Sequence, residues 1–144
     1  MGKSSAFEND LLKLIFQGTN IANLADNTAT DPVTSLYVSL HSADPAGGTQ
    51  STNEISYTTY ARVAVARASG AGGWTITDNS VSPTDNIVFP TPTVLGSGAG
   101  NYVGIGLLAS GAGELLYSGA LTPAITVALG SPPTVLATST LVET

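Results

Sequence analysis

The spacing of the apolar residues changes near Asp31-Pro32, and this change constrains the fold more than any other feature of the sequence. Before that point, Phe7, Leu11 and Ile15 recur every four residues, which places them on one stripe of a helix. After it, apolar and polar residues alternate with the period of two that is typical of half-buried β-strands. The sequence therefore predicts one N-terminal helix followed by a domain built from strands.

The predicted helix has recognisable ends. Ser5 and Glu8 have the spacing of a capping box, and Gly18 is a residue type that commonly terminates helices. We therefore expect a helix over residues 5–17. The change of period divides the chain into an N-terminal helical arm, residues 1–31, and a β-sandwich domain, residues 32–144.

Eight strands are predicted in the second region, joined by connectors rich in glycine and proline. They span residues 35–41, 61–67, 74–77, 86–89, 102–107, 115–118, 124–129 and 134–138. In the second of them, parity places Val63 and Val65 inward and Arg62 outward. Strands at this spacing, with no helical pattern between them, indicate an all-β fold, an antiparallel jelly-roll-like β-sandwich with a short N-terminal α-helix.

The strand over residues 102–107 has an unusual face. Gly104 and Gly106 leave one side of it almost without side chains. A strand of this kind lets another backbone or an aromatic ring approach closely.

Composition excludes several classes of function. The chain has 4 basic and 10 acidic residues, a net charge of −6, and only 10% charged residues, which argues against binding to nucleic acids or to anionic membranes. There is no cysteine, so disulfides and thiolate metal sites are not possible. No apolar run approaches the roughly 18 residues of a membrane-spanning helix. The start of the sequence lacks the apolar stretch of an export signal, which predicts synthesis in a cytoplasm.

Few residues offer catalytic or metal chemistry. His41 is the only histidine, and a triad of His41, Asp44 and a serine lacks the Gly-x-Ser-x-Gly turn that would support it. The acidic residues are scattered singly, without the spacing of a metal site. The Gly96–Gly100 segment has no lysine and no following helix, so it predicts a hairpin loop rather than a phosphate site. We therefore expect no catalytic residue, no metal and no cofactor.

Six residues are candidates for an interface. Tyr57, Tyr60 and Trp74 could form an aromatic platform for sugars, or they could pack in the core of the sandwich. The helical stripe of Phe7, Leu11 and Ile15 must also be buried, because a helix of about 13 residues is marginal alone in water. Its own sandwich, a second copy and a partner shell are the surfaces that could cover it.

Several segments resemble a family of small virion proteins of tailed bacteriophages. The matching segments are Lys3–Glu8 with Leu11–Phe16, Leu36–Pro45, Ser56–Val63, Val88–Pro90 and Leu116–Leu121. The family pattern Leu-Tyr-x-x-Leu-His-Thr-x-Asp-Pro-Gly differs here at Ser42 and Ala46. Asn101–Gly106 also replaces a Thr-His-Phe-Gly type of stretch.

The resemblance implies a structural role in a phage particle. Relatives are often labelled tail fibre proteins, and similar all-β proteins act as cement or decoration proteins on capsids. We expect a decoration protein on the capsid surface, with the major capsid protein as its partner. Self-association is expected as a symmetric homodimer, with a trimer next. The alternative is a tail-associated fibre that recognises a host-surface glycan through Tyr57, Tyr60 or Trp74.

Overall fold

The computed structural model describes residues 2–4, 6–7, 10–11, 20–22, 24, 33–77, 80–96 and 98–142. Within these residues the chain forms ten strands. They are β1 (Gly2–Lys3), β2 (Ser35–His41), β3 (Val63–Ala66), β4 (Trp74–Thr77), β5 (Ser80–Pro83), β6 (Ile87–Val88), β7 (Gly100–Gly106), β8 (Leu115–Ile125), β9 (Thr134–Val135) and β10 (Leu141–Val142).

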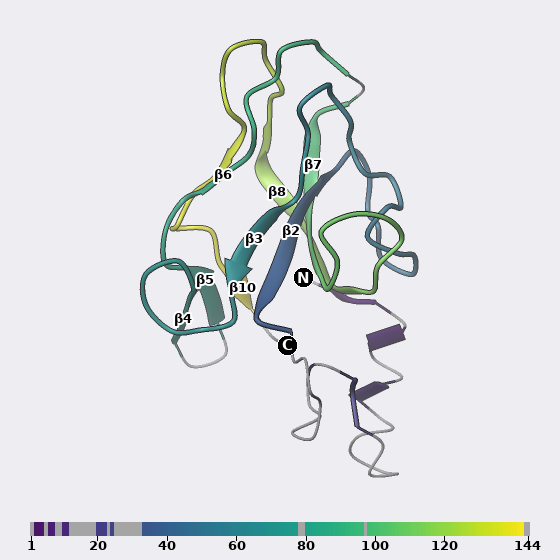
Figure 1. Ribbon diagram of the computed structural model, residues 1–144, viewed down its shortest axis with the longest axis vertical. Helices are drawn as coiled ribbons and strands as arrows, with labels where there is room; N and C mark the ends of the chain where they lie inside the picture. Colours follow the sequence, from purple (N-terminus) through teal and green to yellow (C-terminus); the bar gives the residue numbers. More distant parts are fainter. Residues whose placement is uncertain are drawn as a thin grey trace.

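The strands form two layers (Figure 1). One layer is a five-stranded sheet with the order β1-β8-β7-β2-β3. Facing it are a three-stranded sheet, β10-β5-β4, and a two-stranded ribbon, β6-β9. All the ladders between these strands are antiparallel. The predicted all-β antiparallel fold, a sandwich of two layers, is therefore confirmed.

The main core lies between the two layers. Its buried apolar residues are Val38, Leu40, Ile55, Tyr57, Val65, Ile87, Phe89, Val103, Ile105, Val135 and Leu141. Full burial of one such side chain contributes roughly 1.5–3 kcal/mol relative to its exposed state. This core holds the sheets together over the middle of the molecule, where β2 and β7 lie opposite β6 and β9.

The outer face of the five-stranded sheet is also covered. Ser39 and His41 point to this face, and both have no exposed surface. The segments over residues 42–55 and 107–114 close over them, as their hydrogen bonds to each other show. As a result, the second half of β2 is buried on both sides.

The N-terminal region packs at the end of the five-stranded sheet where β2 and β8 begin, and its neighbours Leu36 and Tyr117 also contact the main core. Phe7 and Ile21 are buried against Leu116 of β8, and Leu11 packs at the edge of this small cluster. The rings of Phe7 and Tyr117 meet edge to face, with centroids 5.4 Å apart. For the described part of the stripe, Phe7 and Leu11, the covering surface is therefore the protein's own sandwich.

Ala6, Phe7, Asp10 and Leu11 are helical, while most of the predicted helix over residues 5–17 lies outside the described residues. The amide of Phe7 donates a hydrogen bond of 3.2 Å to the Ser4 hydroxyl, which is the geometry of a helix cap. Ser5 and Glu8 also lie outside the described residues. The division at residues 31 and 32 stays a prediction, although β1 is already part of the large sheet.

The observed strands differ from the prediction at several places, and β1 and β10 were not predicted. β5 contains Ser82-Pro83, which the sequence indicated as a turn, and β8 continues through Gly119 and Pro123. Pro83 lies opposite Trp74 at the end of the ladder. Thr126–Leu129, predicted as strand, is not in a strand. None of the described residues belongs to a helix long and apolar enough to cross a membrane.

Candidate functional site

A buried ion pair organises the polar interior beneath β2 and β7. The Arg62 guanidinium binds the Glu54 carboxylate with two bonds, Nε to Oε1 at 2.8 Å and Nη2 to Oε2 at 2.7 Å. It also donates to the carbonyl oxygens of Leu108 and Gly111 at 3.0 and 2.8 Å. Arg62 points away from the core side of Val63 and Val65, as parity predicts, but the covering segments bury its side chain, which is 2% exposed.

The hydroxyl of Tyr60 extends this ion pair into the sheet. It donates to Glu54 Oε1 at 2.9 Å and accepts the amide of Leu40 at 3.1 Å. Burial raises the pKa of Tyr60 well above its ordinary value, and the neighbouring Glu54 carboxylate acts in the same direction. The phenol therefore stays protonated and remains a hydrogen-bond donor.

His41 forms the second part of the polar interior. Its Nδ1 lies 2.8 Å from the carbonyl oxygen of Thr52, so Nδ1 must carry the proton. Nε2 then accepts from the Ser39 hydroxyl, 2.8 Å away. Burial lowers the pKa of His41, with the Thr52 carbonyl and the Glu54 charge acting in the opposite direction. A neutral imidazole satisfies both contacts.

The glycine face of β7 makes room for these side chains. A Cβ at Gly104 would lie 2.5 Å from Nε2 of His41 and 2.8 Å from the hydroxyl of Ser39. At Gly106 a Cβ would overlap the side chain of Gln50. The close approach of a ring, which the sequence indicated for this strand, is therefore the contact of His41 with Gly104.

A serine beside a histidine resembles a nucleophile and its base, but this pair is enclosed. Ser39 and His41 have no exposed surface, and the backbone of Gly104 lies against both. The Asp44 carboxylate binds the Ala46 amide and the Ser118 hydroxyl instead of His41. The described residues hold no group of three or more potential metal ligands. The arrangement gives rigidity rather than access to a substrate.

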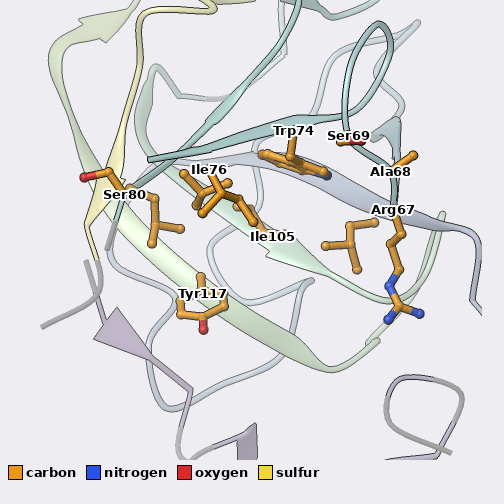
Figure 2. Close-up of a pocket in the computed structure, with 11 residues that line it drawn as sticks. Arg67, Ala68, Ser69, Trp74, Ile76, Ser80, Ile105 and Tyr117 are labelled. Atoms are coloured by element: carbon orange, nitrogen blue, oxygen red, sulfur yellow. The ribbon is translucent and has the colours of Figure 1, made fainter. Parts of the chain in front are cut away.

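An open apolar groove lies between the two layers, at the end where β4, β5 and β10 meet the large sheet (Figure 2). It has a volume of about 840 Å³. Its described lining consists of Leu36, Arg67, Ala68, Ser69, Trp74, Ile76, Ser80, Val81, Ile105, Tyr117 and Leu141. We call this surface the interlayer groove.

Two residues of β4 give the interlayer groove its character. The indole N–H of Trp74 is buried and has no hydrogen-bond acceptor among the described residues. Ile76, on the same face of the strand, is 76% exposed, the largest value among the exposed large apolar residues described. An apolar side chain in water and a polar group without a partner are both unfavourable in the isolated molecule.

The six predicted interface residues lie in different parts of the molecule. Tyr57 is buried, and its hydroxyl donates to the Pro90 carbonyl at 2.8 Å. Tyr60 stacks on Phe89 at 6.1 Å, so these two tyrosines do not form an exposed platform. Trp74 lines the interlayer groove.

The other three predicted residues belong to the arm. Phe7 is buried and Leu11 is half-buried against the protein's own sheet. Ile15 lies outside the described residues. An interface role for the six residues stays a prediction.

Sequence reasoning missed most of the interlayer groove. Val81 and Leu141 belong to β5 and β10, which were not predicted as strands. Leu36, Ile105 and Tyr117 come from strands that were predicted, but the sequence did not show which strands of the other layer face them. The available signal was Trp74 and Ile76 on one face of a short strand beside a turn-rich segment.

The fold and these surfaces define an all-β protein with an internal polar network and an open apolar groove. A family model described as "Podophage GP4 fiber I protein gp80" matches residues 2–143, and the chain belongs to this family. It is therefore a structural protein of a phage virion. No curated protein matches the sequence significantly.

Proposed function

We propose that this protein is a subunit of a fibre attached to the outside of a podophage virion. The observation that carries the proposal is the family match, which extends over residues 2–143 and whose description names a fibre protein. A virion role as such follows from the family. The fibre role, as opposed to the capsid decoration role that the sequence suggested, is the proposal.

The distribution of polar and apolar surface supports a role in protein assembly. The buried groups that could do chemistry, Ser39, His41, Glu54 and Arg62, bind one another or backbone carbonyls inside the domain. The interlayer groove is open and lined mainly by apolar side chains. Exposed apolar surface of this kind marks contacts with other proteins.

Counting copies in purified virions tests the fibre role. Quantitative mass spectrometry would compare this protein with the major capsid protein in the same particles, which serve as the internal standard. A fibre subunit is expected at a small fraction of the capsid protein, because fibres occupy only a few symmetry positions. A copy number close to that of the major capsid protein, together with labelling over the whole head, would establish decoration instead.

A further inference from the structure

The histidine of the polar interior belongs to a chain of four hydrogen-bonding groups. The Ser39 hydroxyl lies 2.8 Å from Nε2 of His41 and 3.3 Å from the carbonyl oxygen of Gly104. Nδ1 of His41 lies 2.8 Å from the carbonyl oxygen of Thr52. Ser39 and His41 have no exposed surface, so water does not complete these contacts. The four groups must therefore satisfy one another in each protonation state of the imidazole.

Both ends of this chain are acceptors. The carbonyl oxygens of Thr52 and Gly104 have lone pairs and no proton, whereas the Ser39 hydroxyl can both donate and accept. Thr52 therefore fixes one proton on Nδ1 of His41, whatever the charge of the ring. The direction of the hydrogen bond between the Ser39 hydroxyl and Nε2 is the part of the chain that can change.

The arrangement satisfies the imidazole both with one proton and with two. In the neutral ring Nε2 is an acceptor, and the Ser39 hydroxyl donates to it. In the imidazolium Nε2 is a donor, so the hydroxyl must accept from it and turn its own proton elsewhere. The carbonyl oxygen of Gly104 lies within reach of that proton. Both N–H groups of the charged ring then have acceptors, and so does the hydroxyl.

The charges around His41 balance a positive ring. Burial lowers the pKa of His41, whereas the Glu54 and Asp44 carboxylates favour the charged form and Arg62 disfavours it. Among the described residues, two carboxylates and one guanidinium therefore surround the ring, and an imidazolium would neutralise their net negative charge. The other titratable side chains near this region are the phenols of Tyr60, which donates to Glu54, and Tyr102, opposite His41 in the ladder.

We propose that the hydrogen bond between Ser39 and His41 reverses when the imidazole gains a proton, with the Ser39 hydroxyl turning from Nε2 to the Gly104 carbonyl. The proton comes from solvent and stays on Nε2. The polar interior then accepts the charge without opening the segment over residues 42–55 that covers it. The inference goes beyond the fibre role and does not depend on it.

The test is direct because the chain has a single histidine. Nitrogen-15 NMR of the full chain, labelled at histidine, reports which ring nitrogen carries a proton. At neutral pH the proton should lie on Nδ1, and acidification should protonate Nε2 while the amide spectrum remains that of the folded protein. The carbon-13 shift of the Gly104 carbonyl should change with the same midpoint. A chain that unfolds before a folded imidazolium forms, or a Gly104 carbonyl that does not respond, would overturn the proposal.

Ser39→Ala separates this reversal from a purely structural contact. The variant removes the donor to the neutral ring and the acceptor for the charged ring. Hydrogen bonds to charged groups are the stronger ones, so the pKa of His41 in the folded variant should fall by about 0.5–1 pH unit. Ser42→Ala is the matched control, because its exposed hydroxyl binds the Asn53 carbonyl, and it should titrate as wild type. Equal midpoints for Ser39→Ala and wild type contradict the reversal. If Ser39→Ala is unfolded, the Gly104 carbonyl of the wild type decides.

Discussion

The two faces of the five-stranded sheet differ in how the space beside them is filled. Beneath β2 and β7, polar side chains meet bare glycine backbone, and His41, Glu54 and Arg62 all have close partners. Between the layers, on the other side of the same sheet, the space is apolar and open, and the Trp74 N–H has no partner in the part of the chain that the structure describes. The contrast indicates that the first region helps to fix the fold, whereas the second is left open.

The largest expected effect tests the closed region. Glu54→Ala should lower the free energy of unfolding by about 3–5 kcal/mol, because it leaves the Arg62 guanidinium buried without its counter-charge. Urea denaturation measures the change. The double variant Glu54→Leu/Arg62→Met removes both charges and should recover most of the loss. A loss under about 1 kcal/mol for Glu54→Ala would mean that the pair is a weak, surface-like one.

The glycine face should tolerate substitution poorly. Gly104→Ala should cost about 1–3 kcal/mol, because the new methyl group would meet His41 Nε2 and the Ser39 hydroxyl at 2.5 and 2.8 Å. Gly2→Ala is the control, since nothing lies within 4 Å of a Cβ there. Equal unfolding midpoints for the two variants would show that the contact with β7 is not tight.

Acid should lower the stability of the fold through protonation of His41 in the unfolded state. Its lowered pKa keeps the imidazole neutral in the folded state, whereas the unfolded chain takes up a proton near pH 6.5. The unfolded state then binds more protons, so stability falls as the pH decreases below about 6.5, by at most about 1.4 kcal/mol per pH unit. Urea unfolding of wild type and His41→Gln, compared between about pH 7.5 and about pH 5.5, isolates this contribution. Identical slopes for the two proteins would contradict it.

The smallest effect is expected in the open region. Ile76→Asn should change the free energy of unfolding by less than about 0.5 kcal/mol, because the side chain is 76% exposed and little packing is lost. The same urea measurement checks this prediction. A loss above about 1 kcal/mol would show that Ile76 belongs to the core and that the interlayer groove is closed in solution.

Local patterns predicted the elements that depend on local chemistry. The alternation of Ser35–His41 and of Trp74–Thr77 gave the bounds of β2 and β4 as the structure has them. β5 and the middle of β8 escaped prediction because Pro83 and Pro123 normally mark turns. Here Pro83 pairs with Trp74 at the end of a ladder, and Pro123 lies in the irregular part of β8 between the pairs Tyr102–Ala120 and Gly100–Ile125.

The polar interior and the interlayer groove depend on contacts between distant segments, which periodicity cannot reveal. Arg62 is buried because Glu54 and the carbonyls of Leu108 and Gly111 surround it, and these come from separate loops. The interlayer groove combines residues from six strands and the segment after β3. The sequence was enough to select a single residue such as Trp74, but it did not predict the surface that the groove residues form together.

The pairing of β1 with β8 has a consequence for how the protein is made. Gly2 lies opposite Ser118, so β1 leaves the ribosome long before the strand with which it pairs. β2 likewise pairs with β7, far along the chain. Sheets assembled from such distant partners form slowly, because the conformational entropy of the long loops is lost before the strand contacts form. The large sheet can therefore be completed only after β8 has been synthesised.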